Sequence, residues 1–221
     1  MERDLVTLLV KLGVVASLAS ILVRSNAVKR MLMREARTLN QRLQLSLWFS
    51  AIFAAGVATR VVFKSYQATD LGLEASLLSG ILGGYVTGLL SGVLISLPAV
   101  FNHELLTMPL LAGVGVLGGL LRDCAPSPEE VWRFTPFVDL SVYRLFTDGR
   151  GRRRTAFHLL FFVSILSAEF LRQMLSLHFP KQLFSFRPSS GHPLVIAATY
   201  VTAVFAVTLP LKIWNNTRNE R

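Results

Sequence analysis

The sequence predicts an all-α integral membrane protein with about seven transmembrane or half-membrane helices. Composition is the first indication, because 52% of the 221 residues are hydrophobic and 16% are charged, whereas soluble domains average about 25% charged residues. The second is that the apolar residues gather in long runs, most of them near the ~20 residues that a helix needs to cross a bilayer. These runs are 5–23, 43–63, 71–101, 105–121, 156–177 and 194–213.

The first two runs and the basic segment between them set the predicted orientation. Segment 24–42 carries Arg24, Arg42 and four further basic residues against one acid, Glu35, and short loops rich in Lys and Arg remain in the cytoplasm. The N-terminus is therefore expected outside. The first run is read as a retained span, because it is too long for a signal-peptide core and has no basic leader. The second run then leads outward.

The run 71–101 decides how many spans there are. As one helix, its 31 residues would extend about 46 Å, against a hydrocarbon core of ~30 Å. A single crossing would place the arginine-rich segment 122–154 outside, whereas a run that enters and returns keeps it inside. We therefore expect either a hairpin of two short spans that breaks near Gly83–Gly84 or a re-entrant pair of half-helices. A continuous helix, suggested by glycine spacing that passes through the break in phase, is the disfavoured alternative.

The remaining segments complete this topology. The last two runs cross outward and inward, so the C-terminus is expected inside. In the cytoplasmic 122–154 linker, the "SPEE" of Ser127–Glu130 is a helix start of the capping-box kind, and short amphipathic helices are expected there on the membrane surface. Residues 1–214 form one polytopic membrane domain, and 215–221 begin a cytoplasmic linker.

Glycines recur at every fourth position of the third run. Close approach of helix backbones requires small residues when lipid surrounds the protein, so a packing face is expected. An alternative is that glycine-interrupted helices present backbone polar groups to a ligand. The motif "GILGG" at 80–84 is repeated as "GVLGG" at 115–119, and the predicted packing residues are Gly80, Gly84, Gly88, Gly92, Gly115 and Gly119.

Several polar residues fall at the predicted outer ends of the spans. Ionisable residues within spans usually face the bundle interior or a cavity, so these residues are expected to line one pocket open to the outer face. The alternative is that they are interfacial residues in contact with water. The mixed charge suggests a small zwitterionic or cationic ligand. The candidate ligand-binding residues are Arg60, Glu74, Asn102, His103, Glu104 and Thr107.

Two further features concern ionisable residues inside the runs. Glu169 and Arg172 are three residues apart, the spacing of an intrahelical pair, and Lys11 is the one charged residue within the first run. Lys11 is expected either to extend toward the interface or to pair with an acid.

The sequence carries no catalytic pattern. It has no Ser–His–Asp set, no HExxH and no phosphate-binding loop, and Cys124 is the single cysteine. No catalytic residues, metal or cofactor are expected. The net charge of +10 lies mainly in the linkers between spans, where topology accounts for it, so no nucleic-acid partner is expected.

The order of these segments resembles a known family. A span, a basic linker, a second span, the glycine block 80–92 and a further "GxxGG" span are similar to the five-transmembrane sensor domain of LytS-type histidine kinases, with the likeness centred on 43–121. The resemblance implies a sensor in a bacterial cell membrane that detects a small ligand and signals to a cytoplasmic kinase, as a homodimer formed through the membrane domain or the kinase. Pyruvate-sensing members use two arginines where this chain has Gly72 and Ala99, so that ligand is not expected.

Two other classes of function remain open. One is a small transporter or a substrate-binding membrane subunit that resembles the S-components of vitamin uptake systems. The other is a membrane scaffold or envelope-assembly protein.

Overall fold

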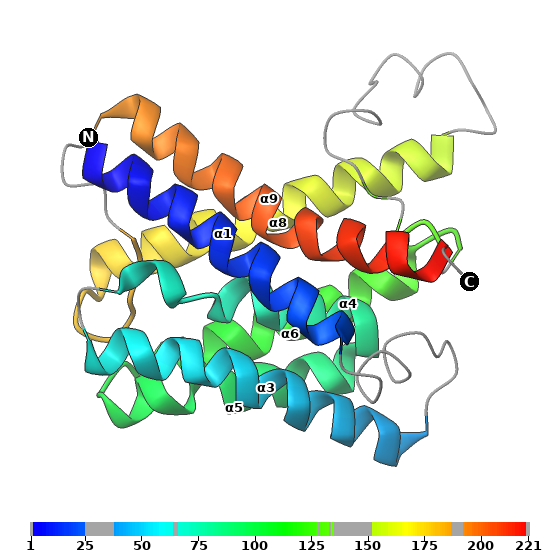
Figure 1. Ribbon diagram of the computed structural model, residues 1–221, viewed down its shortest axis with the longest axis horizontal. Coiled ribbons are helices and arrows are strands. Elements are labelled where there is room, and N and C mark those ends of the chain that lie inside the picture. Colours follow the sequence, from blue (N-terminus) through cyan, green and yellow to red (C-terminus); the bar gives the residue numbers. More distant parts are fainter. Residues whose placement is uncertain are drawn as a thin grey trace.

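The computed structural model describes residues 2–24, 38–63, 66–127, 129–132, 134, 152–186 and 192–219. Within these residues the chain forms α-helices and one 3-10 turn, and no strand (Figure 1). The helices are α1 (Glu2–Arg24), α3 (Leu39–Val62), α4 (Gly72–Gly83), α5 (Tyr85–Phe101), α6 (Thr107–Cys124), α8 (Arg152–His178) and α9 (Pro193–Asn219), and the turn is η1 (Gln67–Thr69). Of the described helices, α1, α3, α6, α8 and α9 are long and apolar enough to cross a membrane, while α5 is apolar but shorter.

The glycine-rich run folds back on itself at Gly84. This residue has φ 89° and ψ 175°, a backbone conformation that is essentially restricted to glycine, and it ends α4 and begins α5. The two helices then contact each other, since a Cβ placed on Gly88 would lie 2.8 Å from the Cα of Gly80. The run is therefore two helices and not one continuous helix, with Leu71 and Phe101 at the same end of the bundle.

The hairpin extends along most of the bundle. Its tip, Gly84, lies beside the side chains of Arg42 and Arg122, and its base lies at the level of Arg60, which is paired with residues on both sides of the hairpin. Arg42 and Arg60 are separated by about 27 Å along α3, at ~1.5 Å per residue. That distance approaches the ~30 Å of a hydrocarbon core. Helix α4, with 12 residues, extends only about 18 Å at ~1.5 Å per residue, so both a hairpin of two short spans and a re-entrant pair of half-helices stay predictions.

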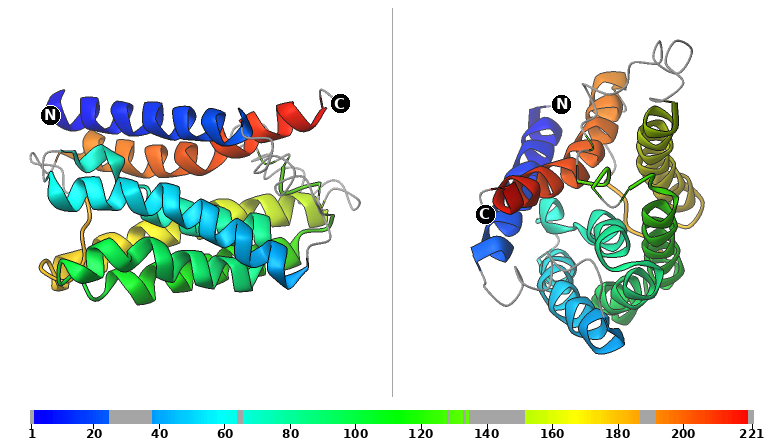
Figure 2. Two further views of the ribbon diagram at one scale, coloured as in Figure 1. Left: turned by 60° about the horizontal axis from the view of Figure 1, so that its bottom comes forward. Right: turned by 90° about the vertical axis from the view of Figure 1, so that its right-hand side faces the viewer.

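The helices run lengthwise in one bundle with two distinct ends, which we call the Arg60 end and the Gly84 end. Viewed along the bundle, α4 lies in the middle and the other helices surround it (Figure 2, right). Helices α1 and α9 lie side by side as a layer on one flank (Figure 2, left). The indole Nε1–H of Trp214 on α9 donates a hydrogen bond of 3.0 Å to the carbonyl oxygen of Ala19 on α1.

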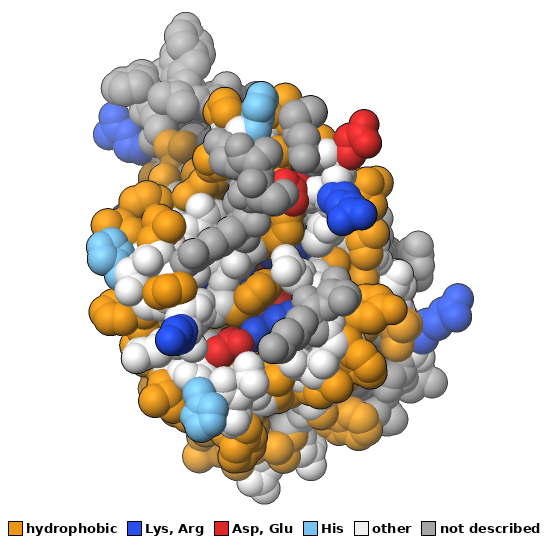
Figure 3. Space-filling view, turned by 90° about the vertical axis from the view of Figure 1, so that its left-hand side faces the viewer, with side chains coloured by type: hydrophobic (Ala, Val, Ile, Leu, Met, Phe, Trp, Pro, Cys, Tyr) orange, Lys and Arg blue, Asp and Glu red, His pale blue; other side chains and the backbone are white. Residues whose placement is uncertain are grey.

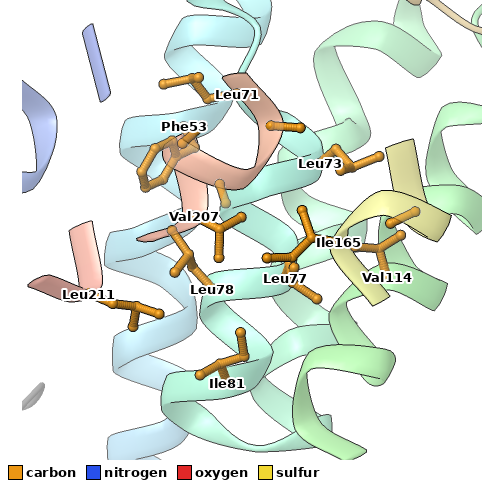
Figure 4. Close-up of a cluster of buried hydrophobic side chains, with 14 of the residues drawn as sticks. Phe53, Leu71, Leu73, Leu77, Leu78, Ile81, Val114, Ile165, Val207 and Leu211 are labelled. Atoms are coloured by element: carbon orange, nitrogen blue, oxygen red, sulfur yellow. The ribbon is translucent and has the colours of Figure 1, made fainter. Parts of the chain in front are cut away.

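Helix α4 is at the centre because small and apolar residues predominate on all its faces, with Glu74 as its one charged residue. All twelve of its residues are buried, as expected for a helix without a polar side. Its leucines and Ile81 pack against side chains from α3, α6, α8 and α9, among them Phe53, Val114, Ile165 and Val207 (Figure 4).

The outer surface of the bundle is apolar, unlike that of a soluble protein. Large apolar side chains are exposed around the bundle, for example Leu9, Leu47 and Val201, whereas charged side chains are buried inside it. At the Arg60 end, side chains of both charge signs lie in the middle of the face, with hydrophobic side chains around the rim (Figure 3). An apolar exterior over several long helices is what a lipid environment requires, and the fold is that of a multi-pass helical membrane protein.

The predicted helix start at Ser127–Glu130 is not observed in the described residues. Residues 129–132 form hydrogen-bonded turns, with Glu130 N–H donating to Ser127 O and Trp132 N–H to Glu129 O. The carboxylate that a capping box would use is engaged elsewhere, because Glu130 Oε2 lies 2.9 Å from Arg154 Nε on α8. The other amphipathic helices expected in the 122–154 linker fall on 135–151, outside the described residues.

Candidate functional site

The Arg60 end is built around the guanidinium of Arg60, near the end of α3. Its Nη1 and Nη2 donate to Glu104 Oε1 and Oε2 at 2.5 and 2.8 Å, the two-pronged geometry that makes Arg–carboxylate pairs strong and specific. Its Nε lies 3.1 Å from Asp70 Oδ2. All three residues are buried. Arg60 thereby connects the segment before α4 to the turn between α5 and α6.

Neighbouring groups fix this arrangement. The aromatic ring of Phe184, after α8, lies 4.3 Å from the Arg60 guanidinium carbon, a distance at which cation–π attraction operates. Asp70 Oδ1 accepts a hydrogen bond of 3.1 Å from the Gly72 backbone N–H. The Asn102 amide donates to Glu104 Oε1 at 3.4 Å. We call Arg60, Asp70, Asn102, Glu104 and Phe184 the Arg60 cluster.

Two more ion pairs lie deeper in the bundle. Lys11 Nζ on α1 contacts Glu74 Oε1 on α4 at 2.5 Å. Arg172 Nη2 contacts Glu169 Oε2 at 2.7 Å within α8, and Gln173 donates to Glu169 Oε1. The predicted intrahelical pair is thus formed, and Lys11 pairs with an acid instead of extending toward the interface.

These pairs are close enough to form one electrostatic unit. Lys11 interacts with Glu169 across the bundle, and Arg172 interacts with Glu74 and Asp70. Three cations, Lys11, Arg60 and Arg172, face four carboxylates, those of Asp70, Glu74, Glu104 and Glu169. Buried ions are costly unless they are paired, and each of these four carboxylates has a cationic partner.

Among these carboxylates, Glu74 has one oxygen atom that accepts no hydrogen bond from the described residues. This atom, Oε2, is buried. The residue lines a narrow, apolar recess between α1, α3, α4 and α9, whose wall also includes Val15, Phe53 and Trp214. The recess has room for about one water molecule, so a larger donor such as an alkylammonium group would reach this carboxylate oxygen only if the surrounding helices moved apart.

The structure brings together only part of the predicted site. Arg60, Asn102 and Glu104 lie in one cluster, and Thr107 is adjacent, since its N–H donates to Glu104 O and its Oγ1 is buried without a described partner. Glu74 lies deeper, against Lys11. His103 is exposed at the turn with a positive φ of 66° and makes no described contact with the carboxylates.

Sequence reasoning missed three members of the site. Asp70 was not among the predicted site residues, although it lies directly before the apolar run 71–101. Phe184 carries no signal of its own. Lys11 was noticed as an isolated charge, but its partner lies 63 residues away.

Most of the predicted packing glycines do lie between helices. A Cβ on Gly80, Gly88 or Gly92 would overlap backbone atoms of α6 near Gly115 or Leu111, and one on Gly119 would overlap Tyr85. Gly84 is different, because it forms the turn and has no other backbone pressed against it. Its role is conformational and not that of a packing residue.

The described residues contain no group of three or more His, Cys, Asp or Glu side chains that is arranged to hold a metal ion. Comparisons with protein-family models, with curated proteins and with solved structures found no match to this chain. Function must therefore be argued from the charged network itself.

Proposed function

We propose that this protein is a membrane-embedded sensor that binds a small cationic or zwitterionic ligand at the Glu74 carboxylate, deeper in the bundle than the Arg60 cluster, and transmits binding to the Gly84 end through α1 and α9. One observation carries the proposal: Glu74, which has an unpaired carboxylate oxygen, contacts α1 through Lys11 and lines the same recess as Trp214 of α9. A ligand that competes for this carboxylate would weaken the link to α1 and alter the environment of α9 at once.

The contacts of α1 and α9 support this path. These helices pack mainly on each other and are joined by the Trp214–Ala19 hydrogen bond, whereas α4, α5 and α6 are held together by glycine contacts. Displacement of the α1–α9 layer relative to the α4–α6 core therefore requires less repacking than movement within the core. A ligand shifts such an equilibrium only by its difference in affinity for the two states, and an ionic contact to Glu74 would provide that difference.

The resemblance to LytS-type sensor domains motivates the further proposal that the output is a cytoplasmic histidine kinase in a bacterial cell membrane, with the chain acting as a homodimer. That part depends on the glycine pattern and the order of the spans alone. The orientation, with the Arg60 end outside, depends on basic residues at the Gly84 end such as Arg42 and Arg122, because basic segments remain in the cytoplasm.

The test uses Trp214 as a reporter. The purified chain with Trp48→Phe and Trp132→Phe retains one indole, and its emission is recorded during titration with ammonium, choline, glycine betaine and a panel of amino acids. We expect a saturable change with at least one probe, and its loss in Glu74→Gln. Glu2→Gln, an exposed charge on α1, is the matched control and should retain the response.

The transporter alternative gives a different result in the same preparation. A carrier reconstituted in liposomes would accumulate the labelled probe, whereas a sensor would bind it without uptake. A probe-induced change that is equal in wild type and Glu74→Gln would place the site elsewhere in the molecule.

A further inference from the structure

The recess beside Glu74 is lined by groups that attract positive charge. It lies between α1, α3, α4 and α9 and has room for about one water molecule. Glu74 is 1% exposed, and its Oε2 has no hydrogen-bond partner among the described residues. The aromatic rings of Phe53 and Trp214 lie in other parts of the wall. A carboxylate and the faces of aromatic rings both attract a cation.

Pro210 adds a second oxygen acceptor to this wall. It lies inside α9, and a proline inside a helix has no N–H to bond the carbonyl oxygen four residues earlier. That carbonyl belongs to Ala206. Residues four apart share one face of a helix, and Ala206 and Pro210 both line the recess. The carbonyl that α9 leaves without its usual donor is therefore on the recess side of the helix.

The side chains that line the recess offer no free hydrogen-bond donor in return. Apart from Glu74 they are apolar or aromatic, and the one N–H among them, on the Trp214 indole, is donated to Ala19 O at 3.0 Å. A water molecule has two donors and two lone pairs, and its lone pairs would find no donor here. An ammonium ion is close to water in size and has four N–H donors and no lone pair. The recess therefore suits an ammonium ion better than water.

Two other cations bear on this choice. Potassium ions are bound in proteins by carbonyl oxygens that replace the hydration shell, whereas this recess supplies Glu74 Oε2 and the carbonyl of Ala206. Lys11 contacts Glu74 Oε1 and also interacts with Glu169, so its charge is shared between two carboxylates. An ionised carboxylate accepts several hydrogen bonds, and Oε2 therefore remains available to a second donor.

We propose that the ligand of Glu74 is an ammonium ion, bound in the recess by Glu74 Oε2, the Ala206 carbonyl and the rings of Phe53 and Trp214. This inference rests on the proposed function, because it names the ligand of the same carboxylate. It narrows the ligand class to a cation that enters the recess without separation of the helices. An ammonium ion at Oε2 would compete with Lys11 for the charge of Glu74, and that ion pair is the link to α1.

The experiment uses the whole chain with Trp214 as its single indole, in detergent near neutral pH. The emission is titrated with the chlorides of ammonium, methylammonium and tetramethylammonium, and with potassium chloride as the control for ionic strength. The variants are Glu74→Gln and Pro210→Ala, and the second restores the N–H that bonds the Ala206 carbonyl while it retains every charge. Pro98→Ala is the matched control, because Pro98 also lies inside a helix, α5, and does not line the recess.

We expect saturable binding of ammonium, with an affinity about tenfold or more above that of tetramethylammonium, because the added methyl groups have no space in the recess. Pro210→Ala should weaken ammonium binding about three- to tenfold, since one acceptor is lost, and Pro98→Ala should bind as the parent chain does. Glu74→Gln should lose ammonium binding. Alanine is favourable in a helix, so a loss of affinity in Pro210→Ala reflects the site and not the fold.

Three results would overturn the inference and leave the proposed function in place. One is Glu74-dependent binding of tetramethylammonium that is as tight as that of ammonium, which would exclude a site of water size. Another is equal ammonium affinity in Pro210→Ala and Pro98→Ala, which would remove the Ala206 carbonyl from the site. The third is a Glu74-dependent change that potassium chloride produces equally. A chain in which no probe gives a Glu74-dependent change would instead contradict the proposed function, and the inference with it.

Discussion

Replacement of Gly115 by alanine tests the helix packing that positions the whole site. A Cβ at this position would lie 2.5 Å from the carbonyl carbon of Gly88 and 3.0 Å from its Cα, whereas carbon atoms in ordinary contact are ~3.5–4.0 Å apart. The backbones of α5 and α6 would have to separate by about 1 Å. Overpacking of this kind costs about 1–3 kcal/mol, and we expect the upper part of that range because both partners are backbone.

The matched control is Gly113→Ala, two residues away on the same helix. A Cβ there meets nothing within 4 Å, so the substitution should be neutral or slightly stabilising through helix propensity. At ~2–4 °C per kcal/mol for a chain of this size, Gly115→Ala should melt about 5–12 °C below Gly113→Ala, as measured by circular dichroism in detergent. Equal melting temperatures would refute close contact between the α5 and α6 backbones.

Three further predictions follow from the turn, the Arg60 cluster and the bundle ends. Gly84→Ala should lower stability by about 1–3 kcal/mol because its positive φ disfavours a Cβ, and chemical denaturation should detect this although a Cβ would meet only Arg122 Nη1 and Arg42 Nη1, at 3.8 and 3.9 Å. Arg60→Gln should cost about 3–5 kcal/mol by leaving buried carboxylates unpaired, and the double variant with Glu104→Gln should recover part of it in a double-mutant cycle; additive losses would contradict direct pairing. In right-side-out vesicles an impermeant maleimide should label His103→Cys in a Cys124→Ser background, whereas Cys124 of the wild type should react only after permeabilisation; the reverse pattern would invert the predicted orientation.

The hairpin at Gly84 could be predicted from the charges of a distant segment, although not from the glycine pattern of the hairpin itself. The glycine spacing alone favours one continuous helix, since a period of four continues through the turn. The basic residues of 122–154 decide otherwise, because this segment and the basic segment 24–42 are both placed in the cytoplasm, which requires an even number of crossings between them. The structure agrees on the fold-back, with Asp70 and Glu104 bound to one arginine.

The function of Gly84 was not predictable from spacing. A glycine that permits close packing and a glycine that permits a positive φ look the same in a sequence, and here both kinds occur in one repeat. The backbone conformation distinguishes them: Gly80 and Gly88 are helical and meet α6, whereas Gly84 reverses the chain.

The ion-pair partners of the buried charged residues also could not be predicted from the sequence. Hydropathy fixes how deep a residue lies but not which helices are neighbours, so Glu74 was placed with Arg60 by depth when its partner is Lys11 on α1. Prediction of that pair requires the lateral order of the helices. Which helices are neighbours depends on side-chain packing, and the spacing of apolar residues or glycines in the sequence does not indicate it.

The arrangement of the helices gives glycine contacts and ion pairs different roles. Glycine contacts join α4, α5 and α6, whereas an ion pair joins α1 to α4. Gly80, Gly88 and Gly115 bring three backbones into direct contact, and packed backbones tolerate little displacement. Helix α1 has no such contact at Gly13, where a Cβ would meet nothing within 4 Å. One polar link from α1 to α4 is the Lys11–Glu74 pair. An ion pair can be exchanged for another ion, whereas a glycine contact cannot, so the ligand response proposed above would begin at α1 and reach α9 through Trp214.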